Sequence, residues 1–155
     1  FNDSSFIDAK ELIPEELEKN KYQLNDIKTI LPKLRGGKKY ELGAINFYGN
    51  RATVLPESYS SMNALYKLMK KNKKMVIQIE GHVNDPFNQQ SEEYQQDLSD
   101  RRAKTICDFL LSKEIDKERM SAIGFGRKHM LFPKAKSEEE QKRNRRVEIN
   151  VITVK

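Results

Sequence analysis

Apolar and polar residues follow two different periods along the chain from about residue 40 onward. Apolar residues at alternate positions predict β-strands, and apolar residues that recur three and four positions apart predict amphipathic helices. These patterns predict strands at 40–48, 75–81, 120–125 and 147–151, and helices from Pro56 through at least 69 and from within 92–98 to about 112. Such an alternation is typical of an α+β domain in which helices cover a single sheet, with β-α-β units at its centre.

The first part of the chain, residues 1–38, does not share this alternation. Short helices are plausible at 14–20, which Pro14 opens, and at 24–31, after which Pro32 and Gly36-Gly37 interrupt the pattern. We therefore expect 1–38 to be an extension from an upstream region, because the sequence starts at Phe1 rather than at Met, and 39–155 to be a domain that folds by itself.

The composition is that of a well-solvated globular domain, with 37% hydrophobic and 34% charged residues, and no apolar run approaches the length of a membrane-spanning helix. The net charge of +6 favours an anionic partner. Its source is diffuse, because the densest cluster, Lys70, Lys71, Lys73 and Lys74, falls at a predicted helix end, where cations complement the helix dipole. No nucleic-acid motif accompanies the charge, so we expect no nucleic-acid partner.

No sequence motif predicts catalysis, a metal or a cofactor. The only cysteine, Cys107, shares a helix face with apolar neighbours and is expected to be buried, and His82 and His129 are not in metal-ligand spacing. Nucleophile-elbow, zinc-protease and phosphate-loop motifs are absent, and no carboxylate pair is singled out for glycan hydrolysis. The sequence therefore favours a binding module over an enzyme.

Sequence blocks along the predicted domain resemble the OmpA-like peptidoglycan-binding domain. They are Ile45-Asn46-Phe47 with the segment 50–58, IQIEGH at 77–82, LSDRRA at 98–103 and NRRVE at 144–148. The resemblance implies a β-α-β-α-β-β fold with one mixed sheet covered by helices. It also implies non-covalent binding of the diaminopimelate-containing stem peptide, without cofactor or turnover. The domain would then anchor an outer-membrane or envelope-spanning protein to the cell wall, in the periplasm of a Gram-negative bacterium.

The resemblance also suggests the ligand-binding residues. Diaminopimelate presents carboxylates and an ammonium, so a selective site needs a guanidinium for the acid and a carboxylate for the amine. Arg102 matches the first role, although a structural ion pair is the plainer alternative, and Arg102→Lys would weaken binding with little change in melting temperature. Of Arg145 and Arg146, which alternate on the last strand, one would line the site and the other would meet solvent. The expected site residues are Tyr48, Asn84, Asp85, Gln95, Leu98, Arg102 and Arg145.

Several departures from the family pattern concentrate in the ligand loops. Val83 and Asn84 replace the Thr and Asp of the usual Gly-His-Thr-Asp turn, Gln95 replaces an Asn further along a longer loop, and Tyr48 replaces an Asp. Either Asp85 has taken over the ammonium, or peptidoglycan binding is lost and the domain is a protein-interaction or structural module. Further partners in an envelope or secretion assembly would act through the upstream region.

Overall fold

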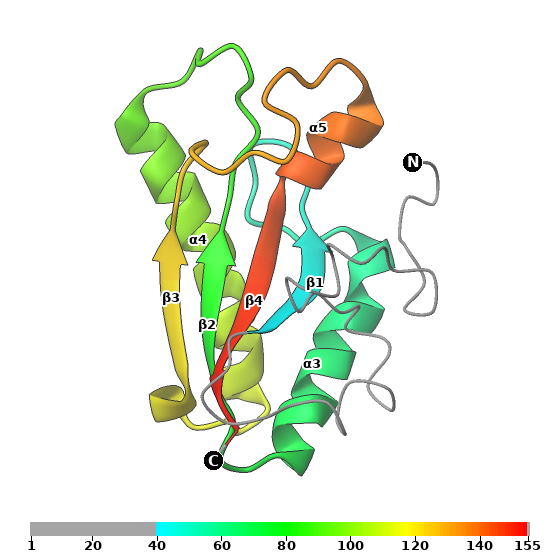
Figure 1. Ribbon diagram of the computed structural model, residues 1–155, viewed down its shortest axis with the longest axis vertical. Helices are drawn as coiled ribbons and strands as arrows, with labels where there is room; N and C mark the ends of the chain where they lie inside the picture. The colour runs from blue at the N-terminus through cyan, green and yellow to red at the C-terminus, as the bar shows by residue number, and fades with distance from the viewer. Residues whose placement is uncertain (1–39, 155) are drawn as a thin grey trace.

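The computed structural model describes residues 40–154, with side chains described from residue 45 onward, so the predicted extension 1–38 lies outside the described residues. A four-stranded sheet has two long helices on one face and a short helix at one end (Figure 1). In chain order the elements are β1 (Tyr40–Asn46), η3 (Pro56–Ser58), α3 (Tyr59–Lys71), β2 (Val76–Gly81), α4 (Glu92–Ser112), η4 (Lys117–Arg119), β3 (Met120–Gly124), α5 (Glu138–Asn144) and β4 (Arg146–Thr153).

The sheet is mixed, with the strand order β1-β4-β2-β3. β2 and β3 are parallel, and β4 runs antiparallel to its two neighbours β1 and β2. The carboxyl ends of β1, β2 and β3 therefore lie at one edge of the sheet, the upper edge in Figure 1, where β4 begins after α5. The loops that follow these strands gather at this edge, which we call the sheet end.

The core lies between the sheet and the helices α3 and α4. Alternate strand residues such as Ile77, Ile79, Val147 and Ile149 are fully buried, as are Leu65, Leu68 and Met69 of α3 and Ala103, Ile106 and Leu110 of α4. Each such large side chain contributes about 1.5–3 kcal/mol when it leaves water. The period of two along β2 and β4 therefore sends one set of residues to the core and places the other set on the face that points away from α3 and α4, which we call the far face.

Two glycines allow α4 to lie unusually close to the sheet. Gly81 on β2 and Gly124 on β3 are register partners. A Cβ at Gly81 would lie 1.9 Å from the carbonyl oxygen of Ser99, and one at Gly124 would lie 2.3 Å from the Ser99 hydroxyl. Side chains at these positions would push α4 outward, so the glycine of the IQIEGH segment serves helix packing. The close approach therefore fixes the position of α4 relative to the sheet, and with it the position of the α4 residues near the sheet end.

The predicted α+β fold, with one mixed sheet covered by helices, is confirmed. Lys70 and Lys71 lie in the last turn of α3, as the helix-dipole interpretation expects. Cys107 is half-buried at the core margin, not buried as predicted. The helix α5 lies in a polar stretch of the sequence and was not predicted. Ser137 caps it by accepting a hydrogen bond from the Glu140 amide. No helix among residues 40–154 has the length and apolar character needed to cross a bilayer.

Candidate functional site

The helix α4 carries three of the expected residues on one buried face. Its start is fixed by Ser91, whose hydroxyl accepts a hydrogen bond from the Tyr94 amide at 3.0 Å. Gln95, Leu98 and Arg102, at helical spacings of three and four, are all buried and face the sheet end. The predicted start of this helix within 92–98 is therefore confirmed at its first residue.

Arg102 connects the loops that follow β1 and β2. Its side chain is 0% exposed, and its guanidinium donates from Nε to the Arg51 carbonyl at 3.0 Å, from Nη1 to the His82 carbonyl at 2.9 Å and from Nη2 to the Tyr48 carbonyl at 2.9 Å. The group also lies 5.4 Å from the centre of the Phe47 ring. Burial, and secondarily the charge of Arg145, lowers the pKa of Arg102 to about 9, so the group is charged at neutral pH. These contacts fit the alternative in which Arg102 has a structural role, except that its partners are main-chain carbonyls rather than an acidic side chain.

A second guanidinium lies beside the first. Arg145 donates from Nε to the Phe47 carbonyl at 3.0 Å and from Nη2 to the Glu138 carboxylate at 2.6 Å. The two arginines thus bind the carbonyls of consecutive residues at the end of β1. One of Arg145 and Arg146 was expected to meet solvent, but neither does: Arg145 is 9% exposed, and Arg146 is 2% exposed and paired with Glu148. For Arg146 the expectation failed because its guanidinium is enclosed at the sheet end, where it donates to the Glu148 carboxylate and to the main-chain carbonyls of Asn144 and His129.

The loop between β2 and α4 is organised around Asp85. This carboxylate is 6% exposed, and it accepts hydrogen bonds from the Gln89 and Gln90 amides, each at 2.8 Å, and from the Gln95 side chain at 2.9 Å. Gln95 also donates to the side chain of Asn88, whose backbone has a positive φ of 52°. The longer loop is therefore closed by a buried carboxylate that binds its own backbone.

Asn84 joins the same loop to α5. Its side-chain oxygen accepts from the Asn144 amide at 2.8 Å, and its nitrogen donates to Gln141 at 3.3 Å. Asn84 is half-buried. Sequence reasoning missed Gln141 and Glu138 as members of the site because the polar stretch that holds them was not interpreted as a helix. Asn144, which begins the NRRVE segment, was the available signal.

Tyr48 is the most exposed of the expected residues, at 39%. Close to it in the chain, Asn50 accepts a hydrogen bond from the Tyr94 hydroxyl at 3.2 Å, which connects the β1 loop to the start of α4. All seven expected residues thus lie on or beside the sheet end, in four chain segments that hydrogen bonds connect. Their roles toward a ligand remain a prediction.

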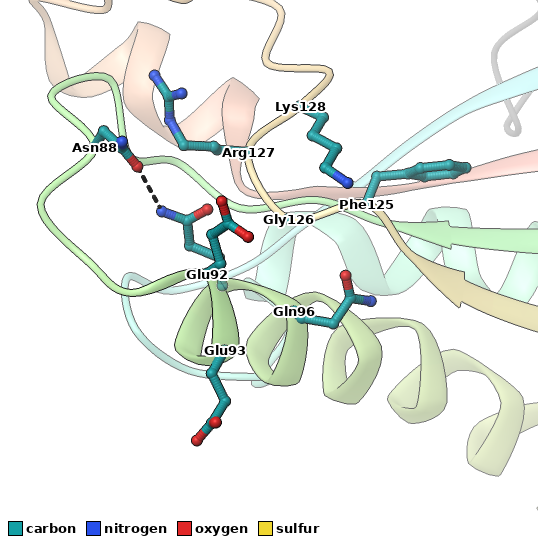
Figure 2. A pocket seen from close by; sticks show the side chains of 9 residues that line it. Asn88, Glu92, Glu93, Gln96, Phe125, Gly126, Arg127 and Lys128 are labelled. Atoms are coloured by element: carbon teal, nitrogen blue, oxygen red, sulfur yellow. Dashed lines mark hydrogen bonds between the residues drawn. The ribbon is translucent and has the colours of Figure 1, made fainter.

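An open hollow of about 370 Å³ lies between the β2–α4 loop, the start of α4 and the segment after β3. Its walls are the first turns of α4, with Glu92, Glu93, Gln95 and Gln96, the loop residue Asn88, and residues 125–128 after β3. Figure 2 shows Arg127 and Lys128 on the β3 side, and Glu92 and Gln96 on the helix side. Gln95 is the expected site residue that lines this hollow.

Comparison with known proteins supports the resemblance seen in the sequence. The OmpA family model matches residues 46–145. The outer membrane protein A of Escherichia coli O157:H7 is 29% identical over 122 residues, which cover 70% of this chain and 34% of that protein, so the chain spans about a third of its relative.

Two solved structures share the fold. An outer membrane protein from Borrelia burgdorferi B31 is 31% identical, with a TM-score of 0.56, over 76% of this chain and 90% of that one. The peptidoglycan-associated lipoprotein from Burkholderia pseudomallei is 18% identical, with a TM-score of 0.62, over 70% of this chain and 88% of that one. The family model covers β2, β3, α3, α4, α5 and the expected site residues of the sheet end, and the chain therefore belongs to the OmpA family.

Proposed function

We propose that this domain binds peptidoglycan non-covalently at the sheet end, through the diaminopimelate-containing stem peptide, and anchors a protein of the Gram-negative envelope to the cell wall on the periplasmic side. Membership of the OmpA family supports the proposal, as does the likeness to a protein named a peptidoglycan-associated lipoprotein. The domain would hold the wall without chemical turnover and without a cofactor.

The observation that carries the proposal is the pair of guanidinium groups at the end of β1. Arg102 and Arg145 bind the carbonyls of Tyr48 and Phe47, next to the exposed Tyr48 side chain. The Arg102 bonds to Tyr48 and Arg51 are only part-buried, whereas its bond to His82 is buried. We infer that a stem carboxylate exchanges with the part-buried loop carbonyls, because a charged acceptor binds a guanidinium more strongly than a neutral one.

The amine of the ligand requires a different partner from the one that the sequence suggested. Asp85 already accepts hydrogen bonds from two amides and one side chain within its loop, and it is nearly inaccessible. Asn84 is more accessible, and it stands where family members have an Asp. We therefore assign Asp85 to holding the loop, and Asn84 to the ligand, as a neutral and weaker partner for the ammonium.

Sedimentation with purified sacculi tests the proposal. The wild-type chain should pellet with sacculi and release no soluble fragments. Asn84→Asp should pellet more completely, because an aspartate keeps an acceptor for Asn144 and restores a charge for the ammonium. Tyr48→Ala should pellet less, with Tyr59→Ala as a matched control, since Tyr59 is exposed at the start of α3.

Equal pelleting by all four proteins would reject the roles assigned to Asn84 and Tyr48. Absence of wild-type pelleting would reject peptidoglycan binding and favour the second candidate, a protein-interaction or structural module. One observation supports that candidate: the hydrogen-bonding groups of Arg102 and Asp85 are already bound within the protein. Release of soluble fragments would instead indicate a hydrolase.

A further inference from the structure

The far face of the sheet carries two acidic side chains directly opposite each other. Glu80 on β2 and Glu148 on β4 are register partners. Like charges in this position repel each other, so the pair needs compensation. Arg146 donates to Glu148 at 2.5 Å, and Asn150 donates to Glu80. One oxygen of each carboxylate is thus held by a neighbouring donor.

The imidazole ring of a buried histidine, His82, faces this pair. The His82 ring is 2% exposed, and neither of its nitrogens has a hydrogen-bond partner among residues 45–154. The ring stacks on Phe125 at a centroid distance of 5.6 Å and meets His129 edge-on at 6.1 Å. A buried polar group without a partner costs about 1–3 kcal/mol, and such groups are rare in folded proteins. His82 therefore points to a partner that residues 45–154 do not supply.

The three side chains lie close enough to share such a partner. One donor atom each from Glu80, His82 and Glu148 lies within 4.8 Å of the others. A neutral imidazole with two carboxylates is a donor set suited to a divalent transition-metal ion.

We propose that Glu80, His82 and Glu148 form a binding site for a divalent cation of the zinc class on the far face of the sheet. Bonds of about 2.0–2.2 Å to such an ion place tetrahedral donors roughly 3.4 Å apart, so donor atoms that lie within 4.8 Å of one another need only small side-chain shifts to bind it. The two carboxylates and Arg146 together carry one net negative charge, which attracts a cation. Arg146 and Asn150 then orient the ligating carboxylates as outer hydrogen-bond donors, a common arrangement at metal sites.

The proposal does not rest on peptidoglycan binding: Glu80 and Glu148 project from β2 and β4, and His82 directly follows β2. The two sites nevertheless meet at one residue, since the His82 carbonyl accepts the buried hydrogen bond from Arg102. The two histidines that have no metal-ligand spacing in the sequence are brought into ring contact by the fold, yet only His82 belongs to the cluster.

Metal titration of the chelator-stripped full chain tests the proposal. Calorimetry with Zn²⁺ should show one ion per chain, Co²⁺ should give the visible absorption of a low-coordinate site, and Zn²⁺ should raise the melting temperature. Glu80→Gln and Glu148→Gln should each weaken Zn²⁺ binding at least about tenfold, since they remove a ligand and outer-sphere changes alone cost 10–100-fold. His129→Ala is the matched histidine control and should bind Zn²⁺ like the wild type.

Nitrogen NMR of the wild-type imidazoles avoids any question of whether a variant folds. Zn²⁺ should move the ring-nitrogen resonances of His82 and leave those of His129 in place. Failure to bind Zn²⁺, or loss of binding in His129→Ala with full binding in both glutamine variants, would overturn the proposal. In the second case the ion would belong to the exposed histidine.

Discussion

At each end of the sheet an arginine donates to three main-chain carbonyls, but the two arginines, Arg102 and Arg119, differ in burial and in what they connect. At the sheet end, Arg102 binds carbonyls in the loops after β1 and β2 and is fully buried. At the opposite end, Arg119 of η4 binds the carbonyls of Met69, Asn72 and Met75, which form the turn from α3 into β2. Arg119 is only half-buried.

The difference between them separates a packing role from a role in a site. Arg119 closes a tight turn between neighbouring elements, and water can reach part of its guanidinium. Arg102 joins loops that are distant in the chain, and its charge lies next to the polar groups of Arg145 and Tyr48. The same three-carbonyl chemistry can thus support a turn or support a ligand site, depending on whether exchangeable loop carbonyls and an exposed side chain lie beside it.

The largest expected effect comes from removing the Arg102 guanidinium. Arg102→Met leaves three carbonyls without their donor and should lower the free energy of unfolding by about 3–5 kcal/mol. Arg102→Lys keeps the charge but cannot reach all three carbonyls, so a loss of about 1–3 kcal/mol is expected. Chemical denaturation measures both values.

This expectation replaces the one drawn from sequence, in which Arg102→Lys leaves the melting temperature nearly unchanged. A lysine variant as stable as the wild type would show that the carbonyl bonds contribute little. It would make Arg102 a ligand residue alone, and the contrast with Arg119 would fail.

Acid should weaken the fold through His82. Burial lowers its pKa from 6.5 to about 2, so below pH 6.5 the unfolded chain binds a proton that the folded chain does not. Stability from this source is complete above pH 6.5 and is lost progressively as the pH falls toward 2. With chelator present, the loss from pH 7 to pH 5 should be about 2 kcal/mol. The imidazole resonances of His82 should not titrate between pH 8 and 5, and titration near 6.5 would contradict the assignment.

The smallest effect is expected at the other end of the sheet. Arg119→Ala should cost about 1 kcal/mol, because water can hydrate the carbonyls that it leaves. Lys117→Ala, an exposed change in the same short helix, serves as the control and should cost nothing measurable in denaturant melts. An Arg119→Ala loss as large as that of Arg102→Met would remove the distinction between the two ends.

The sequence predicts the fold well because its core follows simple periods. Burial alternates along β2, the apolar residues of β4 occupy alternate positions, and Leu98, Arg102 and Ile106 of α4 follow the helical spacing. The short helix α5 escaped prediction because it has no apolar stripe; its signals are a serine cap and three glutamates in the first turn. The boundary between 1–38 and the domain remains a prediction.

The candidate site was predictable in membership but not in its internal contacts. The LSDRRA and NRRVE segments indicated Arg102 and Arg145, since their types and spacing are local properties of the sequence. That Arg102 binds carbonyls, and that Asp85 closes its own loop, depends on loop geometry, which no residue pattern specifies. The burial of Arg146 likewise depends on how α5 and the loop after β3 pack at the sheet end. The same holds for the His82 ring, whose nitrogens have no hydrogen-bond partner among residues 45–154.

The most direct measurement for peptidoglycan binding is an amide NMR titration of the full chain with a diaminopimelate-containing stem peptide at fixed salt. The account predicts saturable shifts confined to the sheet end: residues 47–51, the loop 82–91, the start of α4 from Tyr94 to Arg102, and Arg145. Amides around Arg119 and along α3 should stay in place. Spectra that do not change at millimolar peptide, or shifts centred away from the sheet end, would contradict the account.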